Sequence, residues 1–359
     1  MQQETAKLKA GVVTGNDYLA LVRNCKAQGY ALPAINITGT NTVNAAMEGA
    51  AKSNSDLIVQ LSNGGAQFFA GKGIKDTNRA RVIGAISAAR HVHTVAKEYG
   101  ICVVLHTDHA NKGLIPWVEG MIEASEEEFA ATGRPLFSSH MLDLSEETVE
   151  DNLDDCERIL KRLAKIDMSL EIELGVTGGE EDGVGTDVDL VDNNKLYTQP
   201  SEVLQAYQRL SPIGHFSVAA AFGNVHGVYK PGNVQLRPEI LDKSQVHVQE
   251  TYGTEPKPLD FVFHGGSGSS PEEIREAVGY GVFKMNVDTD TQFAFSKAAG
   301  PYVEEHAKAF KYQIDPDSGT PFKKHYDPRA WLRACEVSMA ERVEQACQEL
   351  GSAGKSVAE

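Results

Sequence analysis

Three histidines in the sequence follow short apolar runs. His109 ends the stretch ICVVLHTDH, His226 comes after FSVAAAFGN, and His264 closes DFVFH. A single histidine is usually a hydrogen-bonded core or surface residue, but three at equivalent positions on separate runs are poorly explained by chance. Three converging imidazoles that leave a fourth position open are the ligand set of a catalytic zinc ion. The sequence therefore predicts a zinc site made by these three residues.

Acidic side chains accompany these histidines. Asp108 precedes His109, Asp143 follows SSHML, and Glu173 lies in LEIELG. A metal-bound histidine usually donates its other N–H to a carboxylate or a carbonyl, so Asp143 and Glu173 are candidate partners of the ligands or alternate ligands. The competing interpretation is a set of buried ion pairs with neighbouring lysines or arginines. Their position at the ends of apolar runs favours the metal site.

Four other histidines are placed differently. His91 and His93 lie in a helix expected over residues 79–98, where side chains two residues apart do not share a face. His106 falls inside an apolar run and is expected to pack there or to support the ligands. His140 comes before the end of its run and stays a further candidate ligand.

Two loops that lead into expected helices are candidate anion sites. The stretch HGGSGS (264–269) leads into Ser270-Pro271-Glu272-Glu273, a capping box with proline at the first helical position. The second loop, 286–289, also precedes an expected helix. Bare backbone N–H groups beside a helix N-terminus bind anions, so both loops predict phosphate binding.

Eight short apolar runs, with helical stretches between them, must position these residues. They read as nearly continuous hydrophobic segments, as parallel strands covered on both faces do. The runs are residues 31–36, 57–62, 101–109, 136–144, 170–175, 216–224, 260–266 and 282–288.

Polar residues lie at or just after the end of nearly every run, and their arrangement distinguishes two α/β folds. These polar residues are Asn36, Ser62, Asp108, His109, Asp143, Glu173, His226, His264, Asn286 and Asp288. A barrel gathers the carboxyl ends of its strands into one ring, whereas a doubly wound open sheet spreads them along a line. The sequence thus predicts a (β/α)8 TIM barrel with additional helices and a C-terminal helical extension.

The chain is expected to form a single catalytic domain over residues 1–359. The C-terminal helical extension covers 300–359, with a long closing helix at 330–350. Segment 178–194, GGEEDGVGTDVDLVDNN, is rich in glycine and acid. It fits a solvated surface loop, but its glycines also fit a mobile active-site loop that closes over substrate.

The composition excludes several classes of partner. A hydrophobic share of 41% and a charged share of 23% suit an ordinary globular core. The formal net charge of -16 repels nucleic acid and anionic lipid. We expect no membrane partner, because no run of about 18 apolar residues and no signal-peptide core is present. The five scattered cysteines form no CxxC pair and indicate a cytoplasmic protein.

Long motifs run through the whole chain. They are LHTDH (105–109), PLFSSHMLDLSEE (135–147), LEIELG (170–175), TGGEEDGV (177–184), FGNVHGVYKPGN (222–233), FVFHGGSGS (261–269), KMNVDTDTQ (284–292) and YDPRAWLR (326–333). Over residues 11–350 the sequence closely resembles class II fructose-bisphosphate aldolases of the longer-chain subgroup. The resemblance implies zinc-dependent, reversible cleavage of fructose 1,6-bisphosphate to dihydroxyacetone phosphate and glyceraldehyde 3-phosphate. A tagatose-bisphosphate aldolase of the same class, with the same metal site, is the alternative.

The resemblance also implies roles in proton transfer. Glu181, with Glu180 beside it, matches the base that removes the C3 proton of dihydroxyacetone phosphate. Asp108 matches the acid/base that acts on the aldehyde oxygen. Asn286 matches the side chain that steadies the enediolate. The implied zinc ligands agree with the three histidines inferred above.

Substrate and ion contacts are implied as well. The positions that match the site of the ketone-side phosphate are Gly227, Gly265, Ser267, Asp288 and Thr289. A monovalent cation, K+ or Na+, is implied at Val225, Gly227, Gly265 and Ser267. The positions that match residues around the second phosphate are Asn36, Ser62, Lys323 and Arg329. Arg329 is expected to come from a partner subunit, which implies a homodimer.

At one motif the chain departs from the family pattern. The family commonly reads Asp-His-Cys-Ala-Lys-Lys where this chain reads DHANKG (108–113), which removes a cysteine and a basic group but no implied ligand.

A serine hydrolase is disfavoured, because Ser269 stands where the last glycine of a GxSxG elbow should be. A non-catalytic phosphosugar sensor would not need Glu181 and Asp108 together.

Overall fold

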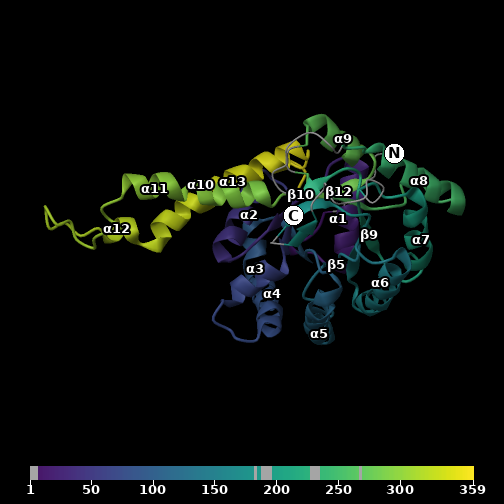
Figure 1. Cartoon of the computed structure of the whole chain (residues 1–359), viewed down its shortest axis with the longest axis horizontal. Coiled ribbons are helices and arrows are strands. Elements are labelled where there is room, and N and C mark those ends of the chain that lie inside the picture. Colours follow the sequence, from purple (N-terminus) through teal and green to yellow (C-terminus); the bar gives the residue numbers. More distant parts are fainter. Residues whose placement is uncertain (1–6, 182–183, 187–195, 227–234, 267–268) are drawn as a thin grey trace.

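Eight parallel strands close into a barrel in the computed structural model, which describes residues 7–181, 184–186, 196–226, 235–266 and 269–359 (Figure 1). For residues 178–181, 184–186 and 225–226 the description covers the backbone alone. The barrel strands are β2 (Leu32–Asn36), β3 (Leu57–Leu61), β4 (Cys102–Thr107), β5 (Ser139–Leu142), β6 (Ser169–Leu174), β9 (Phe216–Ala220), β11 (Phe261–Phe263) and β12 (Val282–Asn286).

Strand pairing decides between the predicted barrel and the alternative, a doubly wound open sheet. The strands follow the order β4-β3-β2-β12-β11-β9-β6-β5, and β4 also pairs with β5, which closes the ring. The short β1 (Gly11–Val12) adds to the amino end of β4. The (β/α)8 barrel is therefore confirmed, and the open sheet is excluded.

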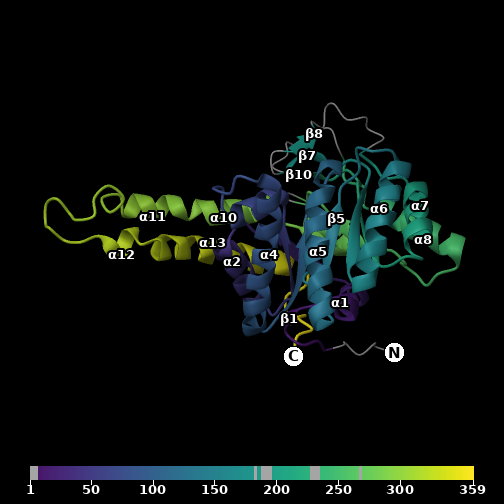
Figure 2. The same cartoon turned by 90° about the horizontal axis from the view of Figure 1, so that it is seen from below.

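Helices surround the barrel (Figures 1 and 2). They are α1 (Gly15–Gln28), α2 (Thr40–Lys52), α3 (Asn63–Ala70), α4 (Thr77–Val95), α5 (Ile115–Thr132), α6 (Val149–Leu163), α7 (Pro200–Leu210), α8 (Glu239–Tyr252), α9 (Pro271–Gly279), α10 (Thr289–Lys297), α11 (Ala299–Glu305), α12 (Lys323–Tyr326) and α13 (Pro328–Glu349), with 3-10 turns at Ala96–Tyr99, Lys112–Leu114 and Ala164–Ile166. Helix α9 begins with the predicted capping box: Glu273 N–H donates to Ser270 Oγ, and Ser270 N–H donates to a Glu273 carboxylate oxygen. This box fixes the start of α9 directly after the glycine-rich loop.

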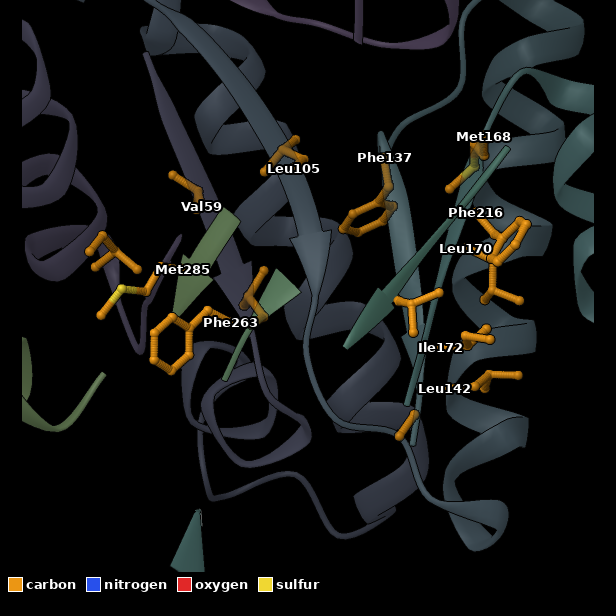
Figure 3. Close-up of a cluster of buried hydrophobic side chains, with 14 of the residues drawn as sticks. Val59, Leu105, Phe137, Leu142, Met168, Leu170, Ile172, Phe216, Phe263 and Met285 are labelled. Atoms are coloured by element: carbon orange, nitrogen blue, oxygen red, sulfur yellow. The ribbon is translucent and has the colours of Figure 1, made fainter. Parts of the chain in front are cut away.

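The hydrophobic core fills the layer between strands and helices. Figure 3 shows part of it, including Val59, Leu105, Ile172 and Phe263, all fully buried. Because side chains alternate along a strand, the residues between these outward-facing ones point into the barrel.

The inner face of the barrel is polar, as the strand register shows. Asn36 lies opposite Gln60, and Gln60 lies opposite His106. His106 in turn lies opposite Ser139. All four are buried. A TIM barrel is usually filled by branched apolar side chains, so this polar interior points to a site at its centre.

The predicted strand over 216–224 is too long. Strand β9 ends at Ala220, and the backbone then turns. Gly223 has φ of 90°, and a Cβ there would lie 2.3 Å from the Gln235 carbonyl oxygen. Asn224 Oδ1 accepts the Phe222 N–H within the same turn. The turn lies between β9 and His226, which was expected just beyond the end of this strand.

His226 instead ends a strand of a second, three-stranded sheet. Strand β10 (Val225–His226) pairs in parallel with β7 (Gly178–Glu181), which pairs antiparallel with β8 (Val184–Thr186). Part of the predicted loop 178–194 is thus a hairpin, and residues 182–183 and 187–194 lie outside the described part. The mobility of the whole segment stays a prediction.

A helical arm extends away from the barrel. It comprises α10, α11, α12 and the first half of α13, which together form the long projection in Figures 1 and 2. The closing helix, predicted over 330–350, begins earlier because Asp327 caps it through the Arg329 N–H and proline takes its first position. Among the described residues no helix is long and apolar enough to span a membrane. The single-domain assignment, with its extension over 300–359, stays a prediction.

Candidate active site

The carboxyl end of β4 delivers Asp108 and His109 to the centre of the barrel. Asp108 N–H donates to the Leu61 carbonyl of the neighbouring β3 at 2.8 Å. His109 then takes φ of 22°, a left-handed conformation that non-glycine residues adopt rarely. Strain of this kind persists where the surrounding structure enforces it, often at functional sites.

Imidazoles and carboxylates converge beside this strand end. The rings of His109 and His264 meet edge to face, with centroids 4.7 Å apart. His109 Nδ1 lies 3.4 Å from Asp143 Oδ2 and 3.7 Å from Glu173 Oε2. Glu173 Oε2 is also 3.5 Å from His264 Nδ1. The structure thus brings together four of the five predicted metal-site residues.

These residues have the geometry and chemistry of a metal site. Candidate ligand atoms of Asp108, His109 and His264 lie within 4.8 Å of one another, as do those of His109, Asp143 and Glu173. Glu173 Oε2 is buried, and it has no hydrogen-bond partner among the described residues. Imidazole nitrogen and carboxylate oxygen are the donors that zinc takes in catalytic sites. A divalent metal therefore fits the residues present. The side chain of His226 lies outside the described part.

The electrostatics of the cluster favour a positive charge at its centre. Burial by itself would lower the pKa of His264, but its contacts with Glu171 and Glu173 raise it to about 9. Burial would likewise raise the pKa of Asp143, yet the neighbouring His109 holds it well below its usual range. Both shifts reflect attraction between cationic imidazoles and the neighbouring carboxylates.

Asp108 is held by three amide side chains. Its Oδ2 accepts hydrogen bonds from Asn36 Nδ2 and Gln60 Nε2, both at 3.0 Å. Its Oδ1 accepts one from Asn286 Nδ2 at 3.3 Å. Asp108 is fully buried, so these amides fix the carboxylate in one orientation.

Gln60 is a site residue that the sequence analysis missed. Gln60 Nε2 also donates to Asn36 Oδ1, so Gln60 links Asn36 to Asp108, both of which were predicted as site residues. The signal was present, because Gln60 interrupts the otherwise apolar LIVQL of β3. A polar residue inside a buried strand needs a partner, and here the partner is Asp108.

In the described part, some of the residues predicted to bind phosphate lie at the carboxyl end of the barrel, and the others lie on the arm. Gly265 takes φ of 58° directly after His264, while Asp288 and Thr289 begin α10 after β12. Ser62 caps α3 through the Gly65 N–H. These residues follow barrel strands at their carboxyl ends, the same end as the metal cluster. Gly227 and Ser267 lie outside the described residues.

Two predicted substrate residues lie on the arm. Lys323 begins α12, and Arg329 is in the first turn of α13 with 87% of its side chain exposed. In one chain they are therefore separated from the barrel centre (Figure 1). The position of Arg329 agrees with the expectation that it serves a partner subunit, an expectation that stays a prediction.

The other histidines have different environments. On α4, His91 contacts Asn44 Oδ1 and His93 contacts the Leu136 carbonyl, each at 2.9 Å. His140 is buried against Thr107 Oγ1, and burial lowers its pKa to about 3. None of these three belongs to the metal-ligand groups found among the described residues.

The fold and the cluster define a barrel enzyme built to bind a divalent metal. A family model described as "Fructose-bisphosphate aldolase class-II" matches residues 16–355. The chain belongs to this family, and it is therefore a lyase that breaks and forms carbon–carbon bonds.

Close relatives cover nearly the whole chain. The fructose-bisphosphate aldolase of Haemophilus influenzae is 54% identical over 96% of each chain. The class 2 fructose-bisphosphate aldolase of Escherichia coli K12 is 51% identical over 96% of this chain and 97% of its own. A crystal structure of the Campylobacter jejuni fructose-bisphosphate aldolase has a TM-score of 0.87 and 50% identity, covering 97% and 98% of the two chains. This similarity confirms the resemblance seen in the sequence.

Proposed function

We propose that this chain catalyses the reversible cleavage of fructose 1,6-bisphosphate to dihydroxyacetone phosphate and glyceraldehyde 3-phosphate in glycolysis and gluconeogenesis. The observation that carries the proposal is the amide-held Asp108 beside the cluster of His109 and His264. A fixed carboxylate can exchange a proton with a substrate oxygen next to a site for a cation. The relatives from H. influenzae and E. coli, named as fructose-bisphosphate aldolases, favour fructose over tagatose.

Zinc is the proposed metal, held by His109, His226 and His264. Bound zinc would polarise the ketone oxygen and stabilise the negative charge that develops on it. Asp143 orients His109 by accepting its Nδ1–H. Glu173, whose Oε2 faces both described histidines, serves as an alternate ligand.

Asp108 and Glu181 divide the proton transfers between the two halves of the substrate. In cleavage Asp108 takes the C4 hydroxyl proton, the C3–C4 bond breaks, and Glu181 supplies a proton to C3. Condensation reverses these steps, and Asn286 steadies the enediolate. The backbone supports the role of Glu181, because β7 places Gly179 opposite His226 and Glu181 two residues farther along.

The two phosphates are proposed to occupy different sides of the site. The ketone-side phosphate is bound by Gly227, Gly265, Ser267, Asp288 and Thr289. Support comes from the position of Asp288 and Thr289 at the start of α10, where backbone N–H groups face outward from the helix end. A monovalent cation, K+ or Na+, lies at Val225, Gly227, Gly265 and Ser267. The second phosphate is bound by Asn36, Ser62, Lys323 and the partner subunit's Arg329.

A homodimer would complete this site. The arm exposes several large apolar side chains, among them Phe293 at 67%, Ile314 at 56% and Tyr312 at 50%. Exposed apolar surface on a projecting element is typical of a subunit interface. We also propose a cytoplasmic location, because all five cysteines are buried free thiols, as in a reducing compartment.

The substrate assignment is tested by comparing two epimers. We expect kcat/KM for fructose 1,6-bisphosphate to exceed that for tagatose 1,6-bisphosphate, which differs only at C4, where Asp108 acts. The measurement is release of dihydroxyacetone phosphate in a coupled assay with each sugar. A higher kcat/KM for tagatose would assign the chain to the alternative aldolase.

Replacing Arg329 should weaken selection for the second phosphate. Arg329→Ala is expected to lower kcat/KM for fructose 1,6-bisphosphate on the order of 10-fold, because a charge-assisted hydrogen bond to phosphate is lost. Cleavage of fructose 1-phosphate should change little, so the ratio of the two values should narrow. Arg333→Ala is the matched control on the same helix, since Arg333 pairs with Glu48 and Glu336. An unchanged ratio in Arg329→Ala would remove Arg329 from the site.

A further inference from the structure

A buried ion pair lies inside the barrel next to the metal cluster. Lys284 Nζ is 2.9 Å from both carboxylate oxygens of Glu171, and each side chain is only 2% exposed. Strands β6 and β12, which carry the two residues, are not neighbours in the sheet. The two side chains therefore meet across the barrel interior.

The same carboxylate contacts a proposed metal ligand. Glu171 Oε1 lies 2.8 Å from His264 Nε2, and His264 is fully buried. The other ring nitrogen, Nδ1, lies on the side of Glu173, 3.5 Å from its Oε2. One nitrogen of His264 thus faces the interior ion pair, and the other faces the metal cluster.

A third group limits how the Glu171 carboxylate can turn. His106 Nε2 is 3.4 Å from Glu171 Oε2, and His106 Nδ1 contacts Ser139 Oγ at 2.8 Å. Burial and the nearby Lys284 lower the pKa of His106 well below its ordinary value, so this ring is neutral. Lys284, His106 and His264 therefore surround Glu171 and fix the plane of its carboxylate.

We propose that Glu171 and Lys284 are positioning residues that select which nitrogen His264 offers to the metal. Glu171 accepts the Nε2–H of His264, which leaves Nδ1 to coordinate. Lys284 binds both oxygens of Glu171 and holds the acceptor in place. The inference rests on the proposed role of His264 as a metal ligand.

Stability alone is a poor explanation for this pair. A buried ion pair can often be replaced by apolar residues of similar volume without loss of stability, because desolvation offsets the attraction between the charges. Barrel interiors are usually filled by valine, isoleucine and leucine. An orienting role explains why a lysine and a glutamate occupy this place, since residues that orient metal-bound histidines strongly affect metal affinity.

Single replacements are unsuitable for a test, because each would leave an uncompensated buried charge and could unfold the chain. Two double variants avoid this. Glu171→Gln/Lys284→Met removes the ion pair but keeps an oxygen that accepts the His264 N–H. Glu171→Met/Lys284→Met removes the ion pair and the acceptor together. The two differ only in the acceptor at position 171.

The readout is Co2+ binding to the full chain, measured by competition with a chelator and by the visible absorption of the bound ion. Glu171→Met/Lys284→Met should bind Co2+ about 10- to 100-fold more weakly than wild type, with an altered spectrum. Glu171→Gln/Lys284→Met should stay within a few-fold of wild type and keep its spectrum. Equal affinity and spectra in the two double variants would overturn the inference.

A matched control removes a buried carboxylate at the other end of the barrel. Asp56, just before β3, accepts hydrogen bonds from Cys102 N–H and Val357 N–H. Asp56→Asn should lower the unfolding temperature without changing Co2+ affinity or the spectrum. If it weakens Co2+ binding as much as Glu171→Met/Lys284→Met does, general destabilisation is the cause and the inference is wrong.

A measurement on the wild-type chain keeps the inference testable if a double variant does not fold. In the zinc-loaded protein, 15N spectra of the histidines should show the His264 proton on Nε2; a proton on Nδ1 would overturn the inference. Absence of Co2+ and Zn2+ binding in wild type would instead refute the proposed metal site itself. The two failures are therefore distinguishable.

Discussion

Chelation is expected to abolish cleavage of fructose 1,6-bisphosphate, and added Zn2+ or Co2+ is expected to restore it. The physical reason is that cleavage leaves negative charge on the ketone oxygen, and the proposed ligands His109 and His264 would hold a cation that stabilises this charge. The measurement is release of dihydroxyacetone phosphate before EDTA, after it, and after titration with each metal. Full turnover by the metal-free chain would contradict the mechanism.

Two replacements separate metal loss from general damage. His264→Ala should lose the metal and the activity together. His93→Ala is the control, because His93 lies on α4 and contacts the Leu136 carbonyl. It should keep both metal and activity. A wild-type metal content in His264→Ala would exclude this residue as a ligand.

A lysine Schiff base is the competing mechanism, and the structure argues against it. Lys284 is the buried lysine among the described residues, and both oxygens of Glu171 accept hydrogen bonds from its Nζ. A lysine nucleophile must be neutral and reach the substrate carbonyl. Borohydride reduction with dihydroxyacetone phosphate should therefore leave no substrate on lysine, and a trapped adduct would contradict this expectation.

The sequence predicts the barrel well because its signal is local. Continuous apolar runs identify strands one at a time, and each of the eight predicted runs overlaps a barrel strand. The strand limits are less accurate. At 216–224 the run stays apolar through Phe222, but Gly223 and Asn224 form a turn that only the packing against Gln235 makes evident.

Residues that meet across the barrel were harder to predict. Glu173 was identified because it stands near a strand end, whereas Glu171 shares its face two residues earlier and was not singled out. Its partner Lys284 is distant in the sequence, and their contact follows from the closure of the ring. Gln60 was missed for a related reason: its role depends on a hydrogen bond to Asp108, which follows the neighbouring strand β4 and is distant in the sequence.

Glu181→Ala and Asp108→Ala should fail at different steps, because the proposed mechanism has the two groups act on different halves of the substrate. Glu181→Ala should keep its metal but lose exchange of the C3 proton of dihydroxyacetone phosphate with solvent. Asp108→Ala should still exchange that proton but fail to join the ketone to the aldehyde. Removal of a positioned general acid or base typically lowers the rate on the order of 10²- to 10⁴-fold. The measurement is isotope exchange at C3, made alongside cleavage of fructose 1,6-bisphosphate.

The control for Asp108→Ala is the replacement Asp108→Asn. Asp108→Asn keeps a side chain of the same shape between Asn36, Gln60 and Asn286, yet it cannot take a proton from the C4 hydroxyl. It should therefore lose cleavage as fully as Asp108→Ala while still folding. Substantial cleavage by Asp108→Asn would show that the residue only shapes the site. Equal C3 exchange in wild type and Glu181→Ala would show that the base lies elsewhere, and Glu180 would be the next residue to replace.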